Sequence, residues 1–508
     1  MGHLPQIDPP ARIPVVLPTP GHLMDHHFQG RPVLPAVEAM EALARVAKNN
    51  YPHIRIDHLS HIEFDKFLFM EPGADHLDAI AELRTAKDGS LQATLLTRTK
   101  APKAAFTRTK IHVRLTFEKL PTPPKSWRID FTAALEGICT IVAPEKIYED
   151  LVPFGPAFRN IRSPLVISPD GALAQIKTPP HQYHGTNAQS LLGSGYALDA
   201  AYHAACVWAQ HYCGIVAFPV AMERRTIISP TGPAKDYVGR VIARTIAGDR
   251  LLFDILLLDR DGLVCEVAEA VHMRDVSGGR LKPPDWIRHT GRHHPLEPLK
   301  NACRDICVIE LDAVAGFAAQ ALTPLEMEKY QKMSPRRAKS FFAGRMALKR
   351  LHRRSMANDW TKPANQIETV GKDSPLPSID VTDSSEKHHC SVSHDRRFAV
   401  AVVASRVVGV DVEVICPKAL NSRRIFMSAA EYHLVQKSSM DDTAAALRIW
   451  SIKEAAAKAT GINLADAWAQ VEVTEVGESK SRITLDGKTA TARHATVDDH
   501  LFTMVVQL

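Results

Sequence analysis

The chain has 508 residues, of which 45% are hydrophobic and 23% charged, and its formal net charge at pH 7 is +6. This composition is typical of a globular protein and excludes a disordered or fibrous one, and the length predicts two to four domains. No apolar run approaches the length of a membrane span, and the eight cysteines are scattered without a metal-type Cys-x-x-Cys pair. We therefore expect no membrane association and a cytoplasmic protein with free thiols.

The first informative segment runs from Asp25 to Pro35 and precedes an apolar helical pattern over residues 35–48. Pro35 suits the first turn of a helix, because it lacks a donor that the helix would leave unpaired. Gly30 permits a close backbone approach, and a helix N-terminus favours negative charge on a carbonyl oxygen. A histidine in this segment could remove the α-proton of a thioester while backbone N–H groups stabilise the enolate.

The rest of the first part is rich in predicted strands. Alternating hydrophobicity predicts strands over residues 90–97 and 110–117, and a second apolar helical pattern covers 197–211. A break at Leu120–Lys125 divides this part nearly in half, so each half has one long helix. Residues 277–300 show neither helical nor strand periodicity of hydrophobic residues, which predicts a linker.

The N-terminal segment resembles the His-x-x-x-Gly-x-x-x-x-Pro motif of hot-dog-fold dehydratases, especially the double-hot-dog domains of polyketide and polyunsaturated fatty-acid synthases. That spacing implies His26 as the catalytic base, with Gly30 at the substrate. The alternative base is His27, because it fits the shorter spacing of stand-alone fatty-acid dehydratases. Both assignments stay open at this point.

Two segments of the second half carry the same resemblance. Phe154–Arg159 is similar to the family's Tyr-Gly-Pro-x-Phe-Gln segment, and Leu198–His203 is similar to its Leu-Asp-x-x-x-Gln/His helix motif. The resemblance implies that Asp199 faces the histidine of the first hot dog and protonates the departing β-hydroxyl, while His203 helps to hold it. Residues 191–196 depart from the usual His-Pro before this helix. The alternatives are a silent module that binds acyl carrier protein, or a thioesterase.

The C-terminal part contains a predicted helix over residues 341–349 within a basic stretch. On this helix Arg345 and Lys349 lie one turn apart. The basic residues do not alternate with aromatic residues that could stack on bases, so we expect no nucleic acid as partner. An acidic carrier protein or nucleotide phosphates fit better. The basic residues are Arg336, Arg337, Lys339, Arg345, Lys349, Arg350, Arg353 and Arg354.

The most specific pattern joins Gly409–Glu413 to Trp450–Lys458. If the first is a strand, Asp411 and Glu413 point to one face, because strand side chains alternate. If the second is a helix, Glu454 and Lys458 lie one turn apart. Carboxylates from two elements are hard oxygen ligands that suit Mg²⁺ and leave room for phosphate oxygens.

These segments resemble the signature of surfactin-type 4′-phosphopantetheinyl transferases, Gly-x-Asp-x-Glu followed by Trp-Ser-x-Lys-Glu-x-x-x-Lys. The resemblance implies transfer of the phosphopantetheine arm of coenzyme A to a serine of apo acyl carrier protein. Magnesium would be held by Asp411, Glu413 and Glu454, and Glu454 would also accept the serine proton. Lys453 and Lys458 would position the phosphates.

Further segments are similar to the same family. Cys390–Asp395 resembles its Ser-x-Ser-His-Ser segment, which implies that His394 binds a coenzyme A phosphate. Gly371 and Lys372 resemble the start of its Gly-Lys-Pro-x-x-Pro loop, although two residues separate Lys372 from the proline. Arg345 and Lys349 would contact the nucleotide end of coenzyme A.

The sequence thus predicts an α+β protein with two activities. A double-hot-dog dehydratase-like domain spans residues 1–276, a linker spans 277–300, and an α+β phosphopantetheinyl transferase domain of two similar halves spans 301–508. The expected partners are acyl carrier protein, coenzyme A, Mg²⁺ and an acyl thioester. Analogy with the family also suggests a homodimer through the hot-dog part.

Overall fold

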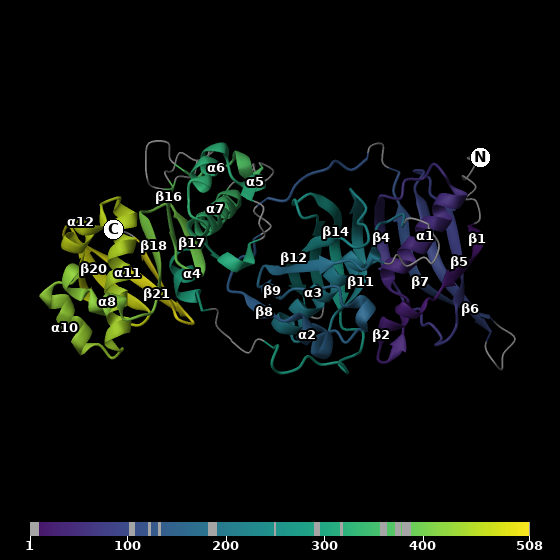
Figure 1. Cartoon of the computed structure of the whole chain (residues 1–508), viewed down its shortest axis with the longest axis horizontal. Coiled ribbons are helices and arrows are strands. Elements are labelled where there is room, and N and C mark those ends of the chain that lie inside the picture. The colour runs from purple at the N-terminus through teal and green to yellow at the C-terminus, as the bar shows by residue number, and fades with distance from the viewer. Residues whose placement is uncertain are drawn as a thin grey trace, which may run out of the picture. The chain divides into compact units, whose positions relative to one another are not determined.

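A computed structural model describes residues 10–100, 107–119, 123–130, 134–180, 190–247, 250–288, 295–314, 318–355, 363–370, 377 and 388–506. Contacts divide the chain into two compact units (Figure 1). Unit 1 comprises Met1–Ile129 and Thr140–His289, and unit 2 comprises Asp130–Cys139 and Thr290–Leu508. Residues 130–139 therefore belong with unit 2, although the sequence predicted one domain over 1–276. Among the described residues, no helix combines the length and hydrophobicity needed to cross a membrane.

Unit 1 is built on a twelve-stranded antiparallel sheet with the order β1-β5-β6-β7-β4-β11-β14-β13-β12-β10-β9-β8. Strands β4 and β11 pair with each other and so join the two halves of the unit. The predicted strands over 90–97 and 110–117 are β6 and β7. The strands are β1 (Ala11–Pro18), β4 (His58–Phe64), β5 (His76–Thr85), β6 (Leu91–Lys100), β7 (Thr107–Phe117), β8 (Thr140–Val142), β9 (Leu165–Ser168), β10 (Gly171–Lys177), β11 (Phe218–Ile227), β12 (Asp236–Ala247), β13 (Arg250–Leu258) and β14 (Val264–Arg274).

One long helix packs against each half of this sheet. Helix α1 (Ala36–Asn50) contacts β6 and β7, and α3 (Gly195–Cys213) contacts β10 and β12. Helix α3 is apolar nearly all round, as expected of a helix enclosed by a sheet, and it ends at Gly214, whose φ of 66° reverses the chain. The predicted fold of two strand-rich halves, each with a long helix, is confirmed. Shorter elements are the hairpin β2 (His27–Phe28) and β3 (Arg31–Pro32), helix α2 (Pro144–Lys146), the π-helix Ile147–Leu151 and the 3₁₀ helices Gly21–Asp25 and Pro156–Phe158.

Unit 2 contains a three-stranded sheet, β15-β17-β16, and a five-stranded sheet, β18-β22-β21-β20-β19. Helix α7 packs on the first sheet and α11 on the second. The strands are β15 (Ile306–Glu310), β16 (His389–His394), β17 (Phe398–Ala404), β18 (Val408–Val414), β19 (Glu472–Glu475), β20 (Lys480–Leu485), β21 (Lys488–Val497) and β22 (His500–Val506). The helices are α4 (Glu297–Ala302), α5 (Ala318–Ala321), α6 (Pro324–Gln331), α7 (Pro335–Ser355), α8 (Lys418–Asn421), α9 (Arg423–Phe426), α10 (Ala429–Lys437), α11 (Asp442–Thr460) and α12 (Leu464–Gln470), with 3₁₀ turns at Leu311–Ala313 and Ala364–Gln366.

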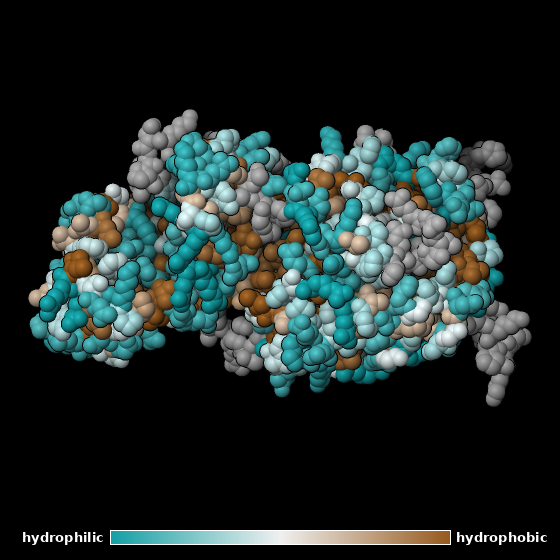
Figure 2. Space-filling view, in the orientation of Figure 1, coloured by the Kyte–Doolittle hydropathy of each residue, from teal (hydrophilic) through white to brown (hydrophobic). Residues whose placement is uncertain are grey.

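Side-chain hydroxyls connect the two sheets of unit 2. Strand β16 lies beside β18, and Val410 N–H and Val412 N–H donate to the hydroxyls of Ser391 and Ser393 at 3.1 and 3.3 Å. Helix α4 begins inside the segment predicted as a linker, because Leu296 and Leu299 are buried in the core of unit 2. Figure 2 shows mainly hydrophilic side chains on the visible face of both units, in keeping with the composition.

Candidate active sites

In unit 1, His26 has a fixed orientation at the end of a 3₁₀ helix. Its backbone N–H donates to the Leu23 carbonyl at 3.1 Å, and its own carbonyl accepts from Val33 N–H at 2.9 Å. The ring Nδ1 lies 2.8 Å from the Val33 carbonyl oxygen. A carbonyl can only accept, so Nδ1 carries the hydrogen and Nε2 has a free lone pair. His26 is therefore held in the tautomer that a general base requires.

Asp199 faces this nitrogen from helix α3. Its Oδ1 lies 3.8 Å from Nε2 of His26, and its Oδ2 lies 3.0 Å from Nε2 of His203, one helical turn further on. All three side chains are largely buried. The structure thus brings together His26, Asp199 and His203, whereas His27 lies on strand β2 with its ring 5.9 Å from that of Phe154.

Aromatic rings enclose the histidine, and a carboxylate outside the predicted site holds them. The rings of Phe154 and Phe158 have centroids 4.5 and 5.0 Å from that of His26. Asp25 accepts the Ala157 N–H through Oδ2 at 2.8 Å, and a Cβ at Gly155 would come within 2.3 Å of its carboxyl group. Asp25 thus fixes the aromatic loop against the histidine. Asp25 stands next to His26 in the sequence, but its bond to the Ala157 N–H could not be predicted from there.

A cavity of about 660 Å³ opens beside these residues. Its wall includes His26, Asp199 and His203 together with apolar groups such as Phe28 and Phe67. Gly30 occupies the hairpin turn instead: its φ is 76° and a Cβ there would meet open space. The positive φ of this turn is a conformation that favours glycine, and the predicted approach of Gly30 to a substrate stays a prediction.

Burial and neighbouring groups together set the protonation states of His26 and Asp199. Burial lowers the pKa of His26, with the Asp199 charge and the Val33 hydrogen bond opposing it and His203 and His27 adding to it. Burial alone would raise the pKa of Asp199, but the charge and hydrogen bond of His203 and the charge of His26 outweigh it, so that its pKa lies below the usual value. At neutral pH the ligand-free site therefore holds a neutral His26 and an ionised Asp199.

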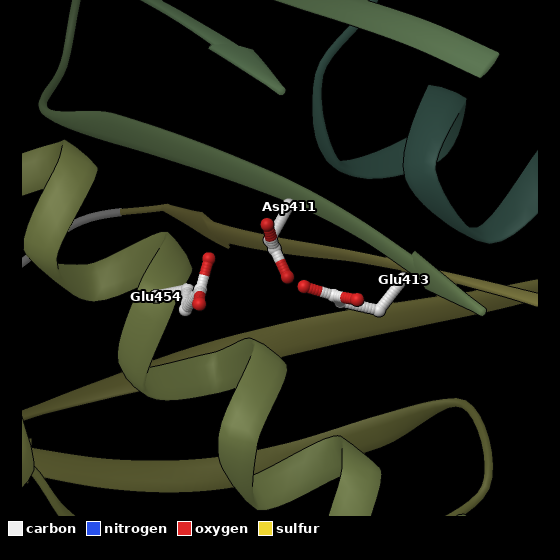
Figure 3. A group of neighbouring side chains, drawn as sticks. All are labelled: Asp411, Glu413 and Glu454. Atoms are coloured by element: carbon white, nitrogen blue, oxygen red, sulfur yellow. The ribbon is translucent and has the colours of Figure 1, made fainter. Parts of the chain in front are cut away.

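In unit 2, three carboxylates converge from two elements (Figure 3). Asp411 and Glu413 lie on strand β18 and Glu454 on helix α11, and one oxygen of each lies within 4.8 Å of the others. The strand and helix predicted for these segments are present. A Cβ at Gly409 would come within 1.9 Å of the Ala455 carbonyl oxygen, so only glycine lets the strand approach the helix this closely. Gly409 thereby sets the separation between the carboxylates.

Hydrogen bonds hold Asp411 from three sides. Its Oδ1 accepts from the Ser393 hydroxyl at 2.9 Å and from Lys458 Nζ at 2.7 Å, and its Oδ2 accepts from the Ser451 hydroxyl at 2.8 Å. Lys458 Nζ also lies 3.9 Å from Glu454. Sequence reasoning missed both serines, although Ser393 precedes the predicted His394 and Ser451 lies inside the second motif.

The cluster has more negative charge than its neighbours neutralise. The pKa of Glu413 is raised to about 7 by burial and by Asp411, against the Trp450 hydrogen bond and the Lys458 and Lys418 charges. The pKa of Glu454 is likewise raised to about 7, by burial and Asp411 above all. Three hard oxygen donors with an excess of negative charge suit a divalent cation such as Mg²⁺.

A second cavity, of about 470 Å³, lies next to the carboxylates. His394 and Glu413 both line it, together with the basic side chains of Arg336, Arg337 and Arg396. Burial, then the Lys458 and Arg337 charges, lower the pKa of His394. One carboxylate of the cluster and several basic side chains thus line one cavity, an arrangement that suits a phosphate ester bound with a metal.

Two lysines predicted to contact coenzyme A are buried elsewhere. Lys453 Nζ donates to Glu431 at 2.9 Å and to the carbonyls of Phe426 and Trp468 at 2.8 and 3.0 Å. Lys349 Nζ donates to Glu326 at 2.6 Å and to two carbonyls, those of Ala321 and Ala364. All three ammonium hydrogens of each lysine are used, so the phosphate contacts expected of Lys453 and Lys349 are replaced by structural ones.

The remaining basic residues have varied surroundings. Arg345 donates to the carbonyl oxygen and the hydroxyl of Thr369 at 2.7 and 3.2 Å, which ties it to the segment after α7 rather than to a free surface. Lys339 pairs with Asp312. Lys372 lies outside the described residues. Of the predicted basic stretch, Arg336 and Arg337 are thus the two that line the cavity with His394.

Comparisons with known families agree with the motifs. Residues 407–505 match the model of the 4′-phosphopantetheinyl transferase superfamily, and residues 133–283 match that of the polyketide synthase dehydratase N-terminal domain. The second range includes Asp199 and begins after His26. The chain is 29% identical over 113 residues to a holo-[acyl-carrier-protein] synthase of Geobacillus kaustophilus, a match that covers 20% of this chain and 88% of that protein.

Solved structures of dehydratase domains also align with the chain. The dehydratase domain from the CurF module of the curacin polyketide synthase is 17% identical and covers 54% of this chain and 95% of its own, with a TM-score of 0.42. A trans-AT polyketide synthase dehydratase domain from Brevibacillus brevis is 19% identical and covers 53% of this chain and 94% of its own, with a TM-score of 0.43.

Proposed function

We propose that this chain, which joins a dehydratase domain of the polyketide synthase type to a 4′-phosphopantetheinyl transferase domain, has two linked activities on one carrier. Unit 2 moves the phosphopantetheine arm of coenzyme A onto a serine of an apo acyl carrier protein. Unit 1 dehydrates 3-hydroxyacyl groups carried by that arm. The observation that supports the transfer most strongly is that Glu413, one of the three clustered carboxylates, lines the same cavity as His394, Arg336 and Arg337.

The transfer requires charge neutralisation and positioning rather than a covalent enzyme intermediate. Asp411, Glu413 and Glu454 would hold Mg²⁺, which when bound neutralises charge on the pyrophosphate oxygens. The serine oxygen attacks the pantetheine-side phosphorus, the bond from that phosphorus to the bridging oxygen breaks, and 3′,5′-ADP leaves with the electron pair. Lys458 and His394 hold phosphate oxygens, and Glu454 takes the serine proton directly or through water.

The dehydration uses the residues of unit 1 alone. Nε2 of His26 takes the α-proton, the C–H electrons form the double bond, and the β-hydroxyl leaves as water after it accepts a proton from Asp199. Asp199 is ionised in the ligand-free site and must first gain that proton. His26, at 3.8 Å, becomes the donor once it has taken the α-proton, so that one proton passes from substrate carbon to leaving oxygen.

Intact-mass spectrometry of the carrier protein tests both activities together. Apo acyl carrier protein is mixed with this protein, Mg²⁺ and 3-hydroxybutyryl-coenzyme A. A gain of hydroxyacyl-phosphopantetheine followed by the loss of one water supports both proposals. Release of the free acid would instead reveal a thioesterase, and a stable hydroxyacyl carrier would leave unit 1 a binding module for that chain.

The setting of these activities is also a proposal. Carrier protein and coenzyme A are the partners that the two domain families imply, and the eight cysteines, all within the described residues, form no disulfide with one another, as expected of a protein in the reducing cytoplasm. A homodimer through unit 1 follows from family analogy. Size-exclusion chromatography with light scattering measures it directly.

A further inference from the structure

Residues 130–139 form part of unit 2 although both of their neighbours in sequence belong to unit 1. They follow β7 and precede β8, so they lie between the two halves of the dehydratase sheet along the chain. The chain consequently passes between the units after residues 129, 139 and 289. We refer to residues 130–139 as the inserted segment; its described residues are Asp130 and Ala134–Cys139.

The inserted segment packs on the free edge of strand β15. Leu135 N–H donates to the Ala313 carbonyl at 3.0 Å, and Gly137 N–H donates to the Val308 carbonyl at 2.8 Å. Ala134 and Leu135 are fully buried, and Ala134 belongs to the same core as Phe342 on helix α7. The segment thus supplies backbone pairing and core side chains, as an added strand does.

Acidic side chains of the inserted segment neutralise the end of helix α7. Asp130 accepts from Arg353 at 3.0 Å, and Glu136 accepts from Arg350 at 3.4 Å and also from Arg354. These three arginines belong to the basic stretch that the sequence assigned to a nucleotide or carrier protein. Part of that basic surface is therefore occupied by a segment of the same chain.

Hydrogen bonds connect the inserted segment to the turn beside His394. Cys139 N–H donates to Oε1 of Glu310 at 2.7 Å, and the Arg397 guanidinium donates to the same carboxylate at 3.1 Å. The backbone N–H groups of Arg397 and Phe398 each donate to Oδ1 of Asp395 at 2.7 Å, which closes the turn that follows His394. Asp395 lines the cavity with His394.

We propose that the inserted segment is a working part of the transferase, and that it positions the phosphate-binding turn through Glu310 and Arg397. Glu310 and Arg397 are positioning residues: they act on His394 and its cavity through the turn. This inference rests on the proposed transferase function for its kinetic consequence. Its structural consequence, the dependence of unit 2 on residues 130–139, is independent of any substrate.

Two variants of the full chain test the inference. In the first, residues 130–139 are replaced by a Gly-Ser linker of equal length, which we expect to lower the unfolding midpoint of unit 2 while dehydration by unit 1 continues. The second variant is Glu310→Gln, which replaces the charged carboxylate by a neutral amide with one acceptor oxygen. We expect KM for coenzyme A to rise about tenfold and kcat to change less than about twofold. Glu475→Gln on β19, which also removes an acceptor of an arginine, is the matched control and leaves KM unchanged.

The readouts separate this inference from the proposed function. A peptide with the sequence of residues 130–139, added to the linker variant, should restore the unfolding midpoint of unit 2. An unchanged midpoint in the linker variant overturns the structural part, whatever the chain catalyses. An unchanged KM in Glu310→Gln, with the native chain active, overturns the positioning role. A native chain inactive toward every carrier protein refutes the proposed function and leaves the midpoint test valid.

Discussion

The buried carboxylates of the two units differ in their pKa values. In unit 1 the pKa of Asp199 lies below its usual value despite burial, beside a His26 whose pKa is also lowered. In unit 2 burial and Asp411 raise the pKa values of Glu413 and Glu454 to about 7. The difference lies in the neighbours. Asp199 lies beside His26 and His203, and their effect on its pKa outweighs that of burial. The three carboxylates of unit 2 face one another, with Lys458 as the nearest cation bonded to them. We therefore expect the first site to act without a metal ion and the second to bind a divalent cation.

Paired substitutions give the largest expected effect and would break this comparison if they failed. Asp411→Asn should lower the transfer rate at least about a thousandfold and leave dehydration intact, because it removes a carboxylate of the proposed metal site that three hydrogen bonds hold in place. Asp199→Asn should lower dehydration by about as much and spare transfer, because an amide cannot pass on a proton. The rates come from intact-mass time courses. Loss of both activities in either variant would contradict two independent sites.

Removal of divalent cations distinguishes the sites without a mutation. With excess chelator, transfer should fall at least about a hundredfold and recover when Mg²⁺ is restored. Dehydration of a preloaded hydroxyacyl carrier should change by less than about twofold, since His26 and Asp199 need no cation. A chelator-sensitive dehydration would show that the site of unit 1 also depends on a cation.

A matched pair of lysines tests which motif residues are structural. Lys453 and Lys349 occupy equivalent positions in the two halves of unit 2, each fully buried against a glutamate of a capping box and two carbonyls. Lys453→Met and Lys349→Met should each destabilise unit 2 by about 3–5 kcal/mol, because each leaves a buried carboxylate without its partner. Urea unfolding measures the loss. If Lys453→Met kept full stability but lost transfer, Lys453 would contact the phosphates after all.

The pH dependence of dehydration gives the smallest effect. The pKa of His26 lies below its usual 6.5, with Asp199, His203 and His27 as the titratable groups that face it. The neutral ring is the base, so kcat/KM should be flat above pH 6.5 and fall as the pH drops through the lowered pKa, about tenfold per unit beyond it. A rate profile from pH 5 to 8 measures the midpoint. A midpoint above 6.5 would mean that Asp199 dominates over burial.

Local periodicity was enough to predict which charged side chains of unit 2 come together. Alternation along a strand placed Asp411 and Glu413 together, and one helical turn placed Lys458 beside Glu454, so their grouping needed no tertiary information. Lys453 adjoins Glu454 in sequence but points elsewhere, because helix neighbours differ by about 100° in direction. The sequence did contain a signal for the burial of Lys453. The capping box Ser428-x-x-Glu431 supplies the glutamate that pairs with Lys453, just as Thr323-x-x-Glu326 supplies the one that pairs with Lys349.

Contacts between distant segments could not be predicted. The pairing of Glu136 with Arg350 joins residues 214 positions apart, and nothing in either segment specifies the other. Asp25 shows the same limit. The motif spacing identified the neighbouring His26, but the hydrogen bond from Ala157 N–H to Asp25 depends on how the two halves of unit 1 pack. For the same reason the bonds from Ser393 and Ser451 to Asp411 appear only in the folded chain.

The most direct test of the central claim follows one carrier protein through both steps, with and without a cation. Apo acyl carrier protein and 3-hydroxybutyryl-coenzyme A are incubated with the native chain in Mg²⁺ or in chelator, and hydroxyacyl carrier protein loaded by the Asp199→Asn variant is then given to fresh native chain in Mg²⁺ or in chelator. We predict that the arm is added only in Mg²⁺ and that water is lost equally in Mg²⁺ and in chelator. Arm transfer that proceeds in chelator, or water loss that stops there, would contradict the account.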